Sequence, residues 1–337
     1  MASPDTPSAT PPPAPSRARL VFDALITVAA GLTMPVQSRM NGALATEISD
    51  PAFAAFVSFG SGFVLLTALL VLPGNRRALG ALWVAIRSRR MPPWLIVAGA
   101  LGAWLVIAQS ISVGVFGVAL FMISLIAGQT VSGLLVDRFG FLADRKQPLT
   151  PMRVIAAVIT IVAVVWSVSG SIPAGLAVGT MVLTALLPLS AGILSGFQQA
   201  MNGRIASTTK APFSATYMNF VAGSIALLVV TLVERTSRGL AVVPQLPAVW
   251  WMYLGGAMGI IFIFTGAHMV PRIGVLRFTI AAIGGQLVGS LLLDWLWPTS
   301  AAGVSFAAIG GAVLTFGAIA LSALPDVRVR QRAEARR

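Results

Sequence analysis

Two short stretches reveal the internal organisation of the chain: Gln37-Ser-Arg-Met-Asn41-Gly42 and, 161 residues later, Gln198-Gln-Ala-Met-Asn202-Gly203. Each lies in a long apolar segment and is followed nine residues after its glycine by a proline, Pro51 or Pro212. Apolar matches between such segments are weak signals, because lipid restricts both to the same few residue types. The shared polar residues escape that restriction, so they indicate an internal repeat.

The repeat extends beyond these two stretches. Residues 30–66 match residues 191–227 at twelve positions. A second block, at an offset of 157, pairs Gly128-Gln129 with Gly285-Gln286 and Asp137 with Asp294. The sequence therefore predicts two repeated halves, residues 20–172 and 173–324. A disordered, proline-rich tail is expected at residues 1–19 and a basic tail at residues 325–337.

Composition excludes an ordinary soluble protein and most catalytic chemistry. Of the 337 residues, 57% are apolar and 10% are charged, against about 25% charged in soluble domains. The absence of cysteine and the single histidine exclude disulfides, thiolate metal sites and histidine clusters. No phosphate-binding G-x-x-x-x-G-K-[ST] motif occurs, which excludes a P-loop ATPase. The apolar composition therefore indicates a membrane protein, and we expect it to use no metal and no cofactor.

Apolar segments long enough to cross a bilayer make up about two thirds of the chain. A bilayer-spanning helix needs about 20 apolar residues. The ten predicted spans are Leu20–Ala45, Pro51–Leu72, Trp94–Ser112, Val115–Val136, Val154–Ser171, Met181–Ile205, Phe213–Val233, Val249–His268, Gly274–Leu296 and Val304–Leu324. The fold class is an all-α integral membrane protein of ten transmembrane helices, whose connecting segments are expected to be loops.

The positions of the basic residues predict how the chain is oriented. With the N-terminus inside, nineteen of the 23 lysines and arginines fall on the cytoplasmic side. The opposite side receives Arg235 and Arg238, while Arg39 and Arg277 fall within spans. Positive residues are retained in the cytoplasm, so both termini are expected there. The net charge of +13 then reflects loops that face membrane lipids, and no nucleic acid partner is needed to explain it.

Five spans in each half imply that the halves are inverted, because an odd number makes the second half enter the membrane from the other side. Inverted repeats are typical of secondary transporters, whose substrate site lies near the bilayer midplane between the repeats. The architecture therefore favours a transporter that works by alternating access.

The repeated motifs resemble those of a known family. Ten-helix carriers built as five plus five form the drug/metabolite transporter superfamily, and the two glutamine-asparagine-glycine motifs are similar to those of its YdcZ-like branch. The resemblance covers about residues 20–324. It implies an exporter in the bacterial inner membrane, formed here by two fused five-helix units. It implies no known substrate and transfers no functional residue. The glycine-dense spans indicate close helix packing within one chain, so a monomer or a homodimer is expected.

Polar residues inside the spans are the candidates for a solute site. Gln37 and Asn41 lie four residues apart and so share a helix face, as do Gln198 and Asn202. Such amides either join helices or line a solute path, and the sequence leaves both alternatives open. The candidate substrate-binding residues are Gln37, Asn41, Gln129, Gln198, Asn202, Asn219 and Gln286.

Arginine and proline add two further candidates in the first span. Arg39 is a candidate anion contact, and Pro35 a candidate helix break beside the amides. Arg277 is expected to extend its side chain to the membrane edge. His268 and the acids are expected at solvated helix ends; these acids are Asp23, Glu47, Asp137, Glu234 and Asp294.

The function predicted from these features is export of a small organic solute. Alternatives that remain open are a flippase for a lipid or lipid-linked metabolite, with Arg39 or Arg277 holding the headgroup, and a scaffold subunit that transports nothing. A membrane-embedded enzyme would need a nucleophile with a base, or a metal cluster. The sequence offers neither, so no enzymatic activity is expected.

Overall fold

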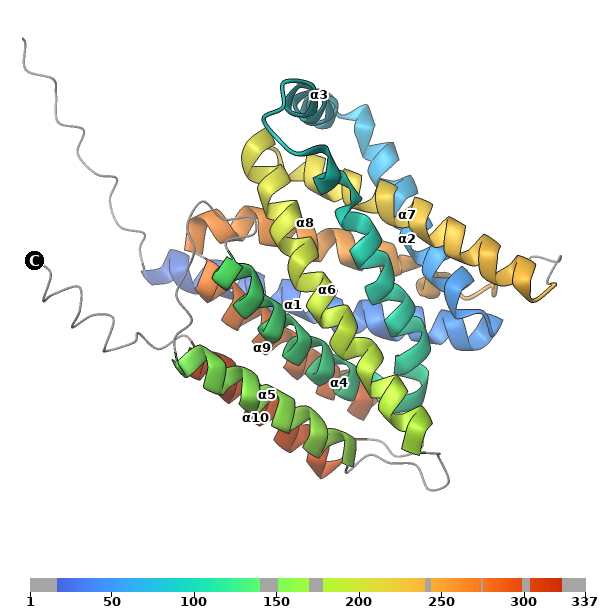
Figure 1. Ribbon diagram of the computed structural model, residues 1–337, viewed down its shortest axis with the longest axis vertical. Coiled ribbons are helices and arrows are strands. Elements are labelled where there is room, and N and C mark those ends of the chain that lie inside the picture. Colours follow the sequence, from blue (N-terminus) through green and yellow to red (C-terminus); the bar gives the residue numbers. More distant parts are fainter. Residues whose placement is uncertain are drawn as a thin grey trace, which may run out of the picture.

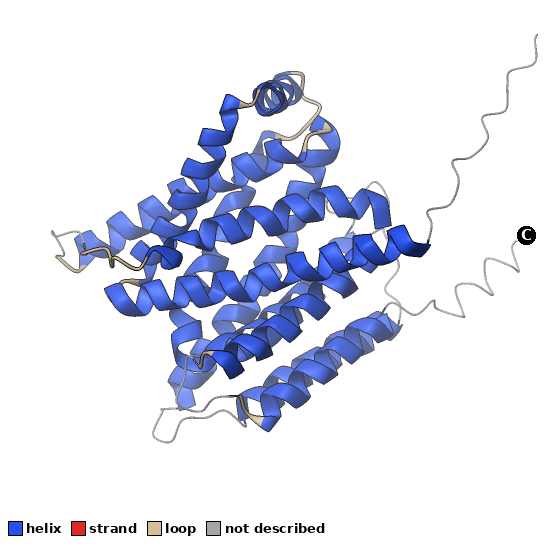
Figure 2. Cartoon of the chain, turned by 180° about the vertical axis from the view of Figure 1, so that it is seen from behind, coloured by secondary structure: helices blue, strands red, loops and turns tan. Residues whose placement is uncertain are grey.

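The structure is a computed structural model that describes residues 17–139, 151–169, 178–239, 244–273, 275–298 and 304–322. Within these ranges the regular structure is entirely helical, as Figure 2 shows. Most of both predicted tails, and the predicted boundary between residues 172 and 173, lie outside the described residues.

Long helices cross one another in a bundle (Figure 1). They are α1 (Arg17–Ile48), α2 (Pro51–Ala68), α3 (Pro73–Arg87), α4 (Ala98–Phe139), α5 (Pro151–Ser169), α6 (Val178–Thr209), α7 (Pro212–Ser237), α8 (Gly255–Ile273), α9 (Val275–Leu296) and α10 (Phe306–Ser322). Short 3-10 turns lead into α4 (Pro93–Val97) and α8 (Trp250–Leu254). In both views α5 and α10 lie side by side at one edge, where they pack on each other.

Helices occur in the described part of every expected span, but fewer than ten of them meet the length and hydropathy needed to cross a membrane. Seven stretches of the described chain are long and apolar enough to cross a membrane, and two more apolar helices are shorter, Trp250–Gly266 and Phe306–Leu321. The third and fourth expected spans are two helices within α4 that meet at Gly117, where φ is 83° and ψ is 173°. A positive φ is accessible to glycine at little cost, which explains why the chain turns at this residue.

Helix α3 corrects one expectation. The basic segment between the second and third spans was expected to be a loop, but Pro73–Arg87 is helical. Its inner side buries Ala78, Leu82 and Ala85, and the Ser214 hydroxyl donates to the Ala78 carbonyl over 2.9 Å. The search for apolar runs missed this helix because half of its surface is polar.

Two close helix contacts between the halves are equivalent by the repeat: in one a glycine of the first half meets the second half, and in the other a glycine of the second half meets the first. A Cβ on Gly31 of α1 would lie 2.2 Å from the Ala282 carbonyl oxygen of α9, and a Cβ on Gly192 of α6 would lie 2.0 Å from that of Leu125 in α4. Gly192 and Leu125 are the repeat counterparts of Gly31 and Ala282. Only glycine permits helix backbones to approach this closely, as in other membrane helix pairs.

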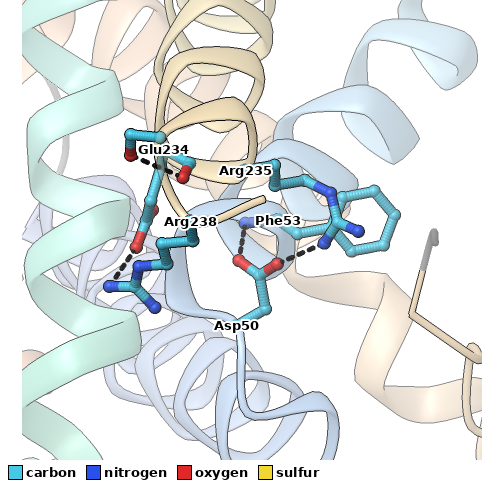
Figure 3. Close-up of polar contacts among 6 residues, drawn as sticks. Asp50, Phe53, Glu234, Arg235 and Arg238 are labelled. Carbon is cyan, nitrogen blue, oxygen red and sulfur yellow. Dashed lines mark hydrogen bonds and ion pairs between the residues drawn. The ribbon is translucent and has the colours of Figure 1, made fainter. Parts of the chain in front are cut away.

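An ion pair joins α2 to α7 at one end of the bundle (Figure 3). Asp50 caps α2 by accepting from the Phe53 backbone N–H over 2.9 Å, and its other oxygen accepts from Arg235 over 2.7 Å. A second pair, Glu234 with Arg238, lies beside it at 2.6 Å. The two pairs differ in burial: the side chains of the first are 11–13% exposed, and Arg238 is 60% exposed.

This difference predicts unequal coupling energies in double-mutant cycles. The cycle of Asp50→Asn with Arg235→Gln should give about 1–2 kcal/mol, because both charges are largely removed from water. The cycle of Glu234→Gln with Arg238→Gln is the control and should give about 0–0.5 kcal/mol. Thermal unfolding in detergent micelles measures both coupling energies. Equal values would contradict the prediction that the more buried ion pair is the stronger one.

Candidate functional site

A cavity of ≈ 60 Å³ lies between the two halves and is lined by α1, α2, α4, α6, α7 and α8. Its polar lining consists of Gln37, Ser195, Gln198, Gln199, Asn202 and Asn219. The remaining lining is glycine and apolar side chains, including the Phe59–Phe220 ring pair, whose centroids lie 5.0 Å apart. All of these lining residues are uncharged.

Three of the predicted amides form one hydrogen-bonded group on the second half. The Asn219 Oδ1 accepts from Gln198 Nε2 over 2.7 Å and from Asn202 Nδ2 over 3.2 Å. Asn219 has serine as its repeat counterpart, Ser58. The group is therefore particular to the second half, and it fixes one polar wall of the cavity.

Gln37 lines the cavity from the first half. Its side chain is buried, since the residue is only 6% exposed, and among the residues that the structure describes none forms a hydrogen bond with its amide. Gly259 of α8 lies against it, because a Cβ there would be 3.2 Å from Gln37 Nε2. Gln37 therefore presents an unpaired donor and an unpaired acceptor to a group that enters the cavity.

Asn41 lies outside the cavity, although it shares a helix face with Gln37. Its Nδ2 donates to Gln109 Oε1 over 2.7 Å, and Gln109 Nε2 donates to Ser38 Oγ over 2.9 Å. All three residues are fully buried. This chain joins α1 to α4 within the first half.

The remaining two predicted amides are also outside the cavity lining. Gln129 Nε2 donates to Ser195 Oγ over 3.1 Å, and the same oxygen accepts from Gln199 over 3.2 Å, so Gln129 supports two lining residues from behind. Gln286 is buried in α9, and its Oε1 has no hydrogen-bond partner among the described residues.

Arg39 and Pro35 lie away from the cavity too. The Arg39 guanidinium lies over the Trp297 ring, 5.2 Å from its centroid, and its charge interacts with Asp294. Pro35 lies inside α1, which continues through it, and packs against Gly289, where a Cβ would be 2.9 Å from its ring. Neither the candidate anion contact nor the candidate helix break therefore lines the cavity.

Asp294 is buried, which corrects the expectation of a solvated helix end. It is 6% exposed, and its two oxygens accept from the backbone N–H groups of Val118 and Ala119, over 3.0 and 2.6 Å. These N–H groups begin the second part of α4, just after the break at Gly117, so the carboxylate caps that helix. Asp23 is also buried, at 4% exposed. The side chains of Asp137 and Arg277 lie outside what the structure describes.

Some residues of this region were missed from the sequence. Phe59 and Phe220 match between the repeats, so a signal was present, but identical apolar residues were discounted. Gln109 has no such signal, because its repeat counterpart is Gly266. Ser195 and Gln199 likewise have no polar pattern that separates them from other residues of α6.

Comparison with known proteins shows which family model the chain matches. The family model described as "Putative inner membrane exporter, YdcZ" matches two segments, residues 22–166 and 183–321. The two matches correspond to the two repeated halves. No curated protein matches the chain.

Proposed function

We propose, from the premise that this chain belongs to the YdcZ family of inner membrane exporters, that it exports a small neutral solute by alternating access. The family is one of exporters and is not an enzyme class, and the apolar helices fit a multi-pass inner membrane protein. The observation that carries the proposal is the unpaired, buried Gln37 amide in a cavity between two repeated halves.

The two halves, residues 20–172 and 173–324, are proposed to be inverted five-helix repeats. Their contacts support this, since exchanged contacts of the kind made by Gly31 and Gly192 are those expected of halves related by a two-fold axis. With five spans in each half, that axis would lie in the membrane plane. Both termini are then cytoplasmic, in agreement with the distribution of basic residues.

Alternating access requires the cavity to change in size. A volume of ≈ 60 Å³ has room for a few water molecules, since about 10–15 Å³ is enough to hold one. A solute larger than this needs the halves to rock apart. Because one chain supplies both walls, a monomer suffices for transport, and a homodimer is not required.

The lining favours a neutral solute that both donates and accepts hydrogen bonds. Gln37 offers both an N–H donor and a carbonyl acceptor, and the amide group opposite is held in a fixed orientation by Asn219. A charged group would leave water without a counter-charge, which is costly in a buried site. The phenylalanine rings accommodate an apolar body. A planar carboxamide or ureido group on a small apolar body fits this lining.

Three probes of nearly identical shape test the charge preference: benzamide is neutral, benzoate is an anion and benzamidine is a cation. We expect benzamide to raise the melting temperature of the purified protein in a concentration-dependent manner, with affinity at least tenfold above that for the two ions. The variant Gln37→Leu should lose about tenfold or more of the benzamide affinity, about 1.4 kcal/mol. The control Gln286→Leu removes an unpaired amide outside the cavity and should retain the affinity.

The outcomes separate binding from transport. Equal responses to the three probes, no response to benzamide, or full affinity in Gln37→Leu would each refute the neutral-solute site. Counterflow of labelled benzamide in proteoliposomes then tests export: binding without counterflow would refute the carrier function and favour a subunit that transports nothing.

A further inference from the structure

Helix α3 has two different sides, and only one is covered by protein. Its inner side, described above, packs on the ends of α6 and α7. The other side carries Arg76, Arg77, Trp83, Val84 and Arg87, which are all exposed. Their spacing of three, four and seven residues places them on one helical face.

This outer face is strongly basic. Arg89 and Arg90 directly follow α3 and are also exposed, so five arginines lie within 15 residues of sequence. The chain has no acidic residue between Asp50 and Asp137, and none in α6. Acidic residues therefore occur neither on α3 nor on α6, and the one acid of α7, Glu234, pairs with Arg238. The arginines of α3 are thus left to bind an external anion.

Trp83 and Val84 lie in the middle of the basic face and are 63% and 55% exposed. An exposed tryptophan flanked by arginines is unusual in water, but it suits the headgroup level of a bilayer, where the indole ring is amphipathic and arginines reach phosphates. The helix also lies between two apolar segments able to span a membrane, Pro51–Val71 and Pro93–Val115. It is therefore tethered at the membrane surface, and Figure 1 shows it almost end-on at the end of the bundle, where the long helices stop.

We propose that α3 is an interfacial helix whose outer face binds the phosphate headgroups of anionic phospholipids. The arginines bind the headgroups, while Trp83 and Val84 enter the boundary with the acyl chains. Because the inner face is packed on α6 and α7, lipid bound to α3 stabilises the contact between the two halves at this end. This proposal is independent of the solute and of transport.

Lipid-dependent thermal stability tests the proposal. The purified protein in zwitterionic detergent is titrated with phosphatidylglycerol or with phosphatidylcholine. We expect phosphatidylglycerol to raise the melting temperature by several degrees, an effect that weakens at high salt, and phosphatidylcholine to have a much smaller effect. The triple variant R76Q/R77Q/R87Q should lose most of the phosphatidylglycerol response, since each arginine near the surface adds to the attraction for anionic headgroups.

A matched control removes the same charge elsewhere. The variant R328Q/R330Q/R332Q changes three arginines near the C-terminus and should retain the full response. The proposal would be overturned if wild type does not distinguish the two lipids, if the α3 variant keeps its response, or if both triple variants lose it equally. An equal rise with inorganic phosphate alone would also overturn it, because that result would assign the face to a free anion. The single variant Trp83→Ala, at an exposed site that tolerates change, should weaken the response without altering the fold.

Discussion

Replacing Gly128 with valine is expected to prevent stable packing of the two halves. A Cβ at Gly128 would lie 2.1 Å from the Leu189 carbonyl oxygen and 2.9 Å from the Gly192 Cα. Both obstructing atoms belong to the backbone of α6, so no side chain can turn aside and the helices must separate. The loss should exceed the about 1–3 kcal/mol of ordinary overpacking, which corresponds to a fall of about 6–12 °C or more in melting temperature.

The control for this substitution lies on the same helix. Gly133 of α4 is exposed, and a Cβ there would meet nothing within 4 Å. Gly133→Val should therefore change the melting temperature by no more than about 2 °C. Gly285→Val, at the repeat counterpart of Gly128, should be as damaging as Gly128→Val, because its Cβ would lie 2.2 Å from the Val28 carbonyl oxygen. If Gly128→Val leaves the melting temperature unchanged, the predicted close contact between α4 and α6 at this glycine is wrong.

Removal of the Asp294 carboxylate is the second substitution with a large expected effect. Asp294→Ala leaves the N–H groups of Val118 and Ala119 without acceptors and removes the negative charge that interacts with Arg39. Each buried donor that loses its acceptor costs about 1–3 kcal/mol, and two such donors are left here. We expect a correspondingly large loss of thermal stability in detergent, and a smaller loss for Asp294→Asn, which keeps one acceptor.

Two companion variants identify the source of this loss. Glu47 is an exposed acid on α1, so Glu47→Gln should change stability by no more than about 0.5 kcal/mol. Adding Arg39→Gln to Asp294→Asn should restore part of the lost stability, since it removes the uncompensated charge. If the double variant is as unstable as the sum of the single ones, the Arg39–Asp294 interaction contributes nothing and the helix cap accounts for the whole effect.

The amphipathic helix α3 and the break in α4 are two features of the fold that the search for apolar runs did not predict. A search for apolar runs found every segment that is apolar on all sides, but it could not find α3, whose arginines alternate with the residues it buries. It also placed the end of the third span at Ser112, whereas the helix turns at Gly117. Glycine permits that turn, but the Asp294 carboxylate, 177 residues away in sequence, supplies the acceptors that stabilise it.

The candidate site was likewise predicted only in part from the sequence. Four of the seven predicted amides, Gln37, Gln198, Asn202 and Asn219, line one cavity. Asn41 has the same spacing from Gln37 that Asn202 has from Gln198, yet it is bound by Gln109. No repeat marks Gln109, so the sequence could not distinguish the amide that binds another helix from the amide that lines the cavity.

The membrane class, the approximate positions of the apolar helices, the family and the two repeated segments could all be predicted from the amino-acid sequence. These properties depend on hydrophobicity, on charge and on matches along the chain, and each can be evaluated from residues that are close in sequence or aligned at a fixed offset. Which amides are paired, and which remain unpaired in the cavity, follows instead from how the helices pack. An amide's partner depends on which neighbouring helix comes within hydrogen-bond reach, and that is set by glycine contacts between helices far apart in the chain.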